Sequence, residues 1–92
     1  MILDEVKKKA IPILRRARVK RAAVFGSAAR DEADARDVDF LVEMPRPYGL
    51  FAFLTLKSEP EDALEKKVDL LEYSTIKPRI RERVLREAVE IV

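Results

Sequence analysis

The sequence lacks several residue types on which enzymes commonly depend. Its 92 residues include no cysteine, histidine or tryptophan, and also no asparagine or glutamine. Without cysteine the chain can form no disulfide, thiolate nucleophile or sulfur-ligated metal centre, and without histidine it can form no Ser-His-Asp triad. Any catalysis must therefore use carboxylates, lysine and arginine, backbone N–H groups, the few hydroxyls or a hard metal ion.

The remaining composition is typical of one small folded domain. The chain carries 19 basic and 17 acidic residues, a net charge of +2, and 48% of its residues are hydrophobic. A chain of this length buries about 60–65% of its unfolded surface, so we expect a single domain over residues 1–92. Abundant glutamate, lysine and arginine without asparagine or glutamine resemble a thermophile's composition. The longest uncharged stretch, 47–56, is too short to span a membrane, which favours a cytoplasmic protein.

Hydrophobic spacing predicts that helices and strands alternate along the chain. Helices are predicted where apolar residues recur every three or four positions, over residues 2–18, 50–66 and 78–92. Strands are predicted for short apolar runs, at residues 21–25, 38–43 and 68–73. A short helix is expected at 27–31, after Gly26. The resulting order α-β-α-β-α-β-α predicts an α/β (α+β) domain, with helices packed on a small mixed sheet of three to four strands.

Prolines interrupt two of the predicted helices. Pro12 removes a helical hydrogen bond, so we expect a kink or a restart there. Ser58 to Glu61 match a capping box with Pro60 in the first turn. The region 50–66 is therefore either two short helices or one kinked helix. Phe51 lies off the apolar stripe of this region, so it either packs on a neighbouring helix or marks a partner surface.

Three aspartates occupy strand positions where aspartate is disfavoured. Asp37 and Asp39 flank Val38, so their side chains point to the same face, roughly 6.5–7 Å apart at the α-carbons. Asp69 lies in the third predicted strand, and if the two strands are neighbours the three carboxylates converge. Like charges this close raise one another's pKa unless a cation intervenes. Magnesium, which prefers oxygen ligands and shares them with substrate phosphates, is the natural cation.

A turn that suits phosphate binding precedes the paired aspartates. Gly26 and Ser27 follow an apolar strand, and glycine lets the backbone approach a ligand closely. The first N–H groups of a following helix, together with the serine hydroxyl, can hold phosphate oxygens. Arg30, one turn further on, is positioned to add positive charge. We therefore treat Gly26, Ser27 and Arg30 as candidate nucleotide-binding residues.

Taken together, these segments resemble a known family. The stretches VFGSAARDEADARDVDFLVE and KKVDLLE, with the ending KPRIRERVLREAV, are similar to minimal nucleotidyltransferases of the DNA-polymerase-β superfamily. The greatest likeness is to the MNT antitoxins that accompany HEPN-domain toxins in archaea and bacteria. That family has Gly-Ser, about ten residues, an Asp-x-Asp strand and a third aspartate in a later strand. The likeness extends from about residue 19 to residue 92.

The resemblance implies a site, a reaction and a partner. Gly26 and Ser27 would bind the nucleotide triphosphate, and Asp37 and Asp39 would ligate magnesium. Asp69 would complete a second magnesium site and help to deprotonate the acceptor hydroxyl. With two magnesium ions as cofactors and ATP as substrate, the enzyme would transfer AMP to a hydroxyl, expected to be a tyrosine, of a HEPN toxin. This modification would neutralise the toxin, so the protein would act as its antitoxin.

The chain departs from the family pattern at two positions. Family members usually have serine directly before the first aspartate, where this chain has Arg36. Many also have glycine after the Gly-Ser segment, where this chain has Asp31. Neither change removes a carboxylate, but Arg36 would crowd or neutralise the site.

Two other functions fit the same residues. An antitoxin with a weak or inactive site would keep the carboxylates and inhibit its HEPN partner by binding alone. A nucleic-acid-binding module would use the basic residues at both ends of the chain, but a net charge of +2 is too small to favour it. We interpret these basic residues as solvated helix faces, with Glu82 and Arg86 as an i,i+4 pair. The sequence leaves a homodimer open.

Overall fold

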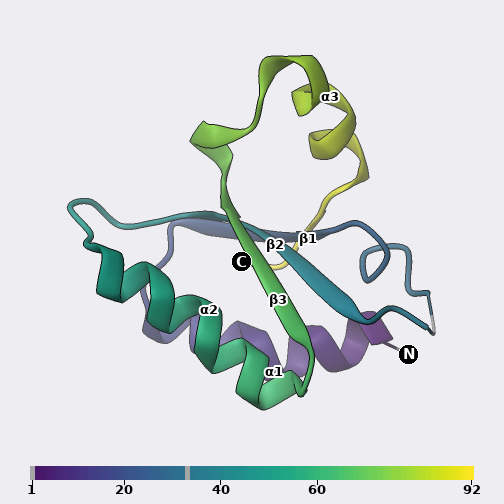
Figure 1. Ribbon diagram of the computed structural model, residues 1–92, viewed down its shortest axis with the longest axis horizontal. Helices are drawn as coiled ribbons and strands as arrows, with labels where there is room; N and C mark the ends of the chain where they lie inside the picture. Colours follow the sequence, from purple (N-terminus) through teal and green to yellow (C-terminus); the bar gives the residue numbers. More distant parts are fainter. Residues whose placement is uncertain (1, 33) are drawn as a thin grey trace.

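A mixed four-stranded sheet separates two helices from a third in the computed structural model, which describes residues 2–32 and 34–92 (Figure 1). The order of elements is α-β-β-α-β-α-β, which confirms the predicted α+β class and mixed sheet. The elements are α1 (Ile2–Arg16), β1 (Arg21–Phe25), β2 (Asp37–Glu43), α2 (Leu50–Leu64), β3 (Lys67–Glu72), the 3-10 turn η1 (Tyr73–Thr75), α3 (Pro78–Glu87) and β4 (Val89–Glu90).

The strands lie in the order β3-β2-β1-β4. β1 runs antiparallel to both β2 and β4, whereas β2 and β3 are parallel. A parallel pair cannot be joined by a tight hairpin, and α2 makes the crossover between these two strands. The three predicted strands are therefore confirmed, two of them starting one residue earlier than expected.

The main hydrophobic core lies between the sheet and the two helices α1 and α2. Val6 and Leu14 of α1 are fully buried against Val24 of β1 and Phe40 of β2, and α2 contributes Leu56. Burying a side chain of this kind stabilises the fold by about 1.5–3 kcal/mol. α1 runs continuously through Pro12 rather than restarting there. This face of the sheet is thus a closed core that fixes the strands.

The opposite face of the sheet is only partly covered. A smaller cluster forms where Ala23 and Leu41 of the sheet meet Tyr73 and Ile76, with Val84 of α3 packed against it. α3 has no fully buried residue, and Figure 1 shows it on the other side of the sheet from α1 and α2. Much of this second face is therefore left uncovered, so side chains on it can contact a ligand.

The segment after Gly26 is a turn and not the predicted short helix. One α-helical hydrogen bond forms, from the Arg30 N–H to the Gly26 carbonyl at 3.2 Å. The next two N–H groups leave that register: Asp31 donates to the Ala28 carbonyl and Glu32 to the Ser27 carbonyl, both at 3.1 Å. Asp31 then adopts the left-handed conformation, with φ 59°, which stops helix propagation after a single turn. A lone turn is costly to nucleate, and only one of its bonds has the α-helical register that a longer helix would repeat.

Of the two alternatives for the region 50–66, the single helix is the one found: α2 covers Leu50–Leu64, and no second helix starts at Ser58. Ser58 lies inside α2 (Leu50–Leu64), where its hydroxyl donates to the Thr55 carbonyl at 3.3 Å. Pro60 is fully buried within the same helix, so packing against the core outweighs the lost backbone bond. Glu65 ends α2 in the left-handed conformation, with φ 53°.

The last predicted helix ends early, and the chain returns to the sheet as β4. α3 stops at Glu87 rather than continuing to the end of the chain. The N–H groups of Ile91 and Val92 then donate to the Ala22 carbonyl at 2.8 and 3.1 Å. The free edge of β1 offers unpaired backbone groups, which must find partners when buried. Pairing with β1 therefore outweighs the helical spacing of Ala88 and Ile91, and these last residues do not continue the helix.

Asp31 connects the turn after β1 to the start of α1. Its Oδ1 accepts a hydrogen bond from the Leu3 N–H at 2.8 Å, and so caps one of the unpaired N–H groups at the helix start. Its left-handed backbone favours glycine but tolerates aspartate. This accounts for the departure from the family's glycine at this position.

Replacing Asp31 with alanine should lower the free energy of unfolding by about 1–2 kcal/mol, because the cap is lost. Asp31→Asn keeps a side-chain oxygen and tolerates the same backbone conformation, so it should stay near wild type. Urea denaturation of the three proteins measures the difference. Equal stability of Asp31→Ala and wild type would show that the cap contributes nothing.

Candidate active site

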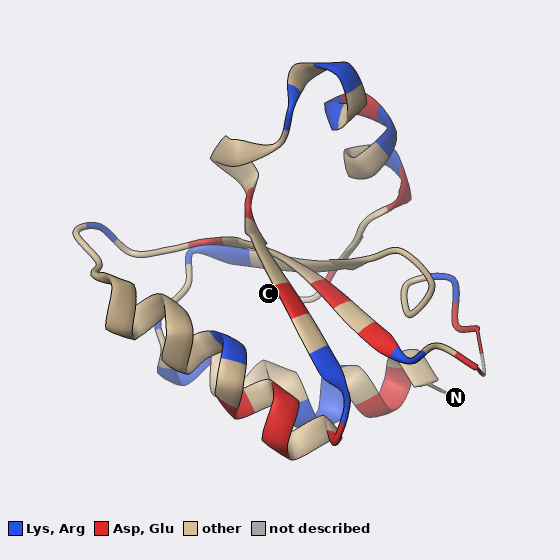
Figure 2. Cartoon of the chain, in the orientation of Figure 1, with Lys and Arg blue, Asp and Glu red and all other residues tan. Residues whose placement is uncertain are grey.

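The three aspartates lie on the partly covered face of the sheet, opposite α1 and α2. Val38 and Phe40, which alternate with Asp37 and Asp39 along β2, both point into the main core. The paired aspartates therefore point the other way, because successive strand side chains alternate faces. Figure 2 shows acidic positions side by side on β2 and β3.

Asp39 and Asp69 are direct neighbours across the parallel pair β2 and β3. The pKa of the Asp39 carboxyl is raised from 3.8 to about 6. Burial of the carboxyl is the largest cause, followed by the charge of Asp69, a hydrogen bond shared with it, and the charge of Asp37. The two strands are thus neighbours, as the convergence of the carboxylates requires. The acidic groups of Asp39 and Asp69 lie close enough to affect each other's ionisation.

Asp37 does not join this pair as a third close ligand. Within residues 2–32 and 34–92, no three acidic side chains lie close enough together to form a metal site. Asp37 is exposed at the start of β2, where Lys67 is its neighbour in the register. The structure therefore brings Asp39 and Asp69 together. It leaves Asp37 on the same face of the sheet, two residues before Asp39 along β2.

The aspartates have no basic partner in the described part of the chain. None of the ion pairs found there includes Asp37, Asp39 or Asp69. Arg36, directly before β2, is exposed and also makes none. Arg36 therefore does not neutralise the site in this structure.

Gly26 packs directly against the Asp39 carboxyl. Its φ is +75°, a conformation that side chains rarely adopt, and an added Cβ would lie 2.6 Å from Asp39 Oδ2. Only glycine fits this backbone beside this carboxylate. The turn and the aspartate strand therefore form one unit.

Ser27 and Arg30 occupy the turn beside this unit. No backbone hydrogen bond found among the described residues is donated by the N–H groups of Ser27, Ala28 or Ala29. Such N–H groups are suited to anionic oxygens. Arg30 Nε instead donates to Glu32 at 2.7 Å, so its guanidinium is paired with Glu32 and not with the aspartates.

A second polar cluster on the same face was not predicted. It gathers Arg21, Glu43 and Tyr73 at the other end of the strands, with Glu72 beside them on the core side of β3, opposite Val42 in the register. Glu72 is buried, and it accepts hydrogen bonds from the Tyr48 hydroxyl and from the Met44 N–H. Its members come from separate segments, so no local sequence pattern marks them.

The structure thus places a glycine turn beside apposed strand aspartates on a mixed sheet, and comparison with known proteins gives the family. Residues 8–92 match the family described as Polymerase beta, Nucleotidyltransferase. The chain is 44% identical, over 100% of both chains, to a candidate protein adenylyltransferase of Methanocaldococcus jannaschii. It is 39% identical to the protein adenylyltransferase MntA of Thermococcus cleftensis, covering 79% of this chain and 75% of that protein. The chain therefore belongs to the polymerase beta nucleotidyltransferase family, and it is a minimal nucleotidyltransferase.

Solved structures share this fold. One, described as a candidate minimal nucleotidyltransferase, is 36% identical with a TM-score of 0.77, covering 90% of this chain and 86% of that one. A toxin–antitoxin structure with AMP-PNP matches with a TM-score of 0.77 at 20% identity, over 94% of this chain and 72% of that one. A tri-AMPylated Shewanella oneidensis HEPN toxin in complex with an MNT antitoxin matches with a TM-score of 0.74 at 20% identity, over 98% and 71%.

No helix within residues 2–32 and 34–92 is both long enough and apolar enough to cross a bilayer.

Replacing Gly26 with alanine should lower the free energy of unfolding by more than about 1–3 kcal/mol. The left-handed backbone alone costs that much for a residue with a Cβ, and the contact with Asp39 adds to it. The matched control is Gly49→Ala, where an added Cβ meets nothing within 4 Å and φ is negative. That variant should stay within about 1 kcal/mol of wild type. Equal effects of the two substitutions would contradict this packing.

The raised pKa of Asp39 predicts a pH-dependent stability in the absence of divalent cations. Between pH 3.8 and about 6 the unfolded chain ionises this carboxyl while the folded chain keeps it protonated. Stability should therefore fall as the pH rises through this window, because the unfolded state binds fewer protons there. Asp39→Asn cannot ionise and should gain stability relative to wild type from pH 4 to pH 7. A constant difference in urea midpoint across this range would contradict the shift.

Proposed function

We propose that this chain is a magnesium-dependent protein adenylyltransferase, which transfers AMP from ATP to a hydroxyl of a HEPN-domain toxin and so acts as its antitoxin. The observation that carries the proposal is a pair of apposed strand aspartates, one of them packed against Gly26, that form no ion pair within residues 2–32 and 34–92. Burying part of a carboxylate beside another is costly unless a cation joins them. A nucleotide with its bound magnesium supplies that cation.

The donor set fits magnesium in its chemistry. Asp39 and Asp69 offer carboxylate oxygens on neighbouring strands, and Asp37 lies on the same face. Magnesium takes one or two carboxylates together with water and substrate phosphates, so it does not require three protein ligands in contact. When bound, two such ions polarise the transferred phosphate and stabilise the leaving pyrophosphate. We assign Asp37, Asp39 and Asp69 as the residues that hold them.

The chain's own groups position the nucleotide and the acceptor. Gly26 allows the phosphates to approach the backbone, and the N–H groups after it, with the Ser27 hydroxyl, donate to phosphate oxygens. Asp69 accepts the proton of the acceptor hydroxyl as that oxygen attacks the α-phosphate, and pyrophosphate leaves. The chemistry depends on position and charge rather than on a covalent enzyme intermediate. Arg30 can bind the nucleotide phosphates only if its guanidinium leaves Glu32.

The proposal of a toxin partner is supported by relatives and by an exposed apolar surface. Relatives of the same fold have been solved with HEPN toxins, one of them AMPylated, and one toxin–antitoxin structure holds AMP-PNP. Phe51 is 87% exposed, with Leu50 and Leu54 exposed beside it on α2. Phe51 therefore does not pack on a neighbouring helix, and its exposure favours a partner surface.

Transfer of labelled AMP from α-labelled ATP to a purified HEPN partner tests the activity. Asp39→Asn and Asp69→Asn should each lower the rate at least about 100-fold, the lower range for a positioned acid or base. Removing divalent cations with EDTA should abolish transfer. The matched control is Asp62→Asn, because Asp62 is exposed on α2, away from the open face.

Two results would overturn the proposal in different ways. Equal labelling by wild type and Asp39→Asn would show that these aspartates do not carry the reaction. Toxin inhibition without any AMP transfer by wild type, at saturating ATP and magnesium, would make the protein an antitoxin that acts by binding alone. Identification of the labelled residue by mass spectrometry then tests whether the acceptor is tyrosine.

A further inference from the structure

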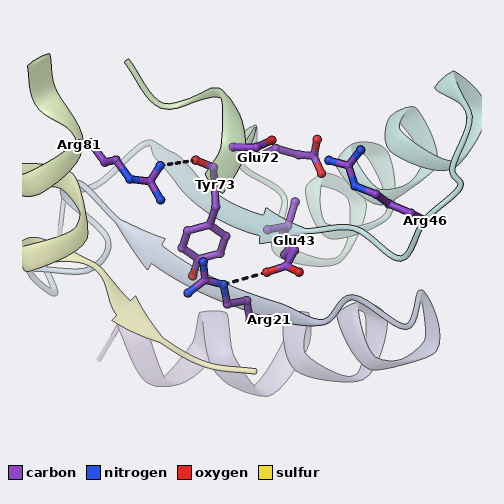
Figure 3. Close-up of a pocket in the computed structure, with 8 residues that line it drawn as sticks. Arg21, Glu43, Arg46, Glu72, Tyr73 and Arg81 are labelled. Atoms are coloured by element: carbon purple, nitrogen blue, oxygen red, sulfur yellow. Dashed lines mark hydrogen bonds and ion pairs between the residues drawn. The ribbon is translucent and has the colours of Figure 1, made fainter. Parts of the chain in front are cut away.

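A polar cavity of about 260 Å³ lies on the same face of the sheet as the aspartates, at the opposite end of the strands (Figure 3). Arg21 of β1, Arg46 of the connection before α2 and Arg81 of α3 line it. Glu43, in its wall, lies four residues beyond Asp39 along β2, which is about 13 Å at 3.3 Å per residue. The cavity is therefore separate from the candidate active site.

Two of the three guanidinium groups are held in place by contacts within the cavity wall. Arg21 Nε donates to Glu43 at 3.1 Å, and its guanidinium lies 3.9 Å from the centre of the Tyr73 ring. Arg81 donates one N–H to the Tyr73 carbonyl at 2.7 Å. A guanidinium has five N–H donors, so each of these arginines keeps further donors while its position is fixed. Figure 3 shows the three arginines entering from different sides.

The charge of the wall favours an anion. Three arginines face two glutamates, which leaves one positive charge in excess. Glu43 is paired with Arg21, and Glu72 accepts hydrogen bonds from Tyr48 and Met44. Guanidinium groups bind carboxylates and phosphates through paired N–H donors. Because these three arrive from three directions, a tetrahedral phosphoryl group with several free oxygens suits them better than a flat carboxylate.

We propose that this cavity is a second anion site, which binds the phosphoryl group of a small phosphate ligand independently of magnesium and of the aspartates. Its three arginines come from β1, from the connection before α2 and from α3. An anion bound there joins Arg81 of α3 to Arg21 of the sheet. Since α3 buries no residue fully, occupancy holds this helix against the face that also carries the aspartates.

Binding to the full chain in EDTA tests this site, because metal-dependent binding at the aspartates is then excluded. Isothermal titration with inorganic phosphate and with AMP should show binding of both, together with a raised melting temperature. Arg46→Gln and Arg81→Gln should each weaken binding at least about tenfold. The matched control is Arg83→Gln, on the exposed side of the same helix and outside the cavity wall, which should bind as wild type does.

The two probes also separate the sources of the phosphoryl group. Equal affinities indicate that an isolated phosphate group is recognised, whereas tighter binding of AMP indicates that the nucleoside contributes. Arg46→Lys and Arg81→Lys keep the charge, so their folding is preserved while the paired donors are lost; both should still bind more weakly than wild type. Absence of phosphate and AMP binding by wild type, or unchanged binding by the Arg46→Gln, Arg81→Gln double variant, would overturn the proposal. Neither outcome bears on AMP transfer.

Discussion

The contact between Asp39 and Asp69 is the constraint on which the rest of the site depends. The parallel register of β2 and β3 places these carboxylates side by side, and their mutual repulsion adds to the burial that raises the pKa of Asp39. Gly26 is pressed against the same carboxyl. The turn, the strand pair and the perturbed acid are therefore one arrangement, and a change in any of them displaces the others.

Such an arrangement is unfavourable by itself, so the fold must supply stability elsewhere. The fully buried side chains of α1 and of the inner sheet face, with Phe40 the largest of them, form the main core. Phe40 lies next to Asp39 on β2 but points to the opposite side of the sheet. One face of the strand thus fixes its register while the other presents charged groups. Perturbed ionisable groups held by a rigid support are typical of functional sites.

Much of this arrangement could be predicted from the sequence, because its signals are local. The strand spacing of Asp37 and Asp39 was sufficient to place these two on one sheet face, whereas Asp69 joins them because β2 and β3 pair, which the sequence left as a condition. The predictions failed where contacts between residues far apart in the sequence determine the local structure. The cap from Asp31 to Leu3 joins residues 28 apart, and the return of residues 88–92 to β1 depends on an edge that no local pattern reveals. The basic cavity joins three separate segments for the same reason.

The central claim is that the apposed aspartates are held ready for a cation that arrives with the nucleotide. The most direct measurement is the titration of the Asp39 carboxyl by carbon-13 NMR, first in EDTA and then with magnesium and a non-hydrolysable ATP analogue. Without the cation the carboxyl should titrate at about 6, and with it the pKa should fall below the ordinary value, because an adjacent positive charge favours the ionised form. The same titration midpoint under both conditions would contradict the account.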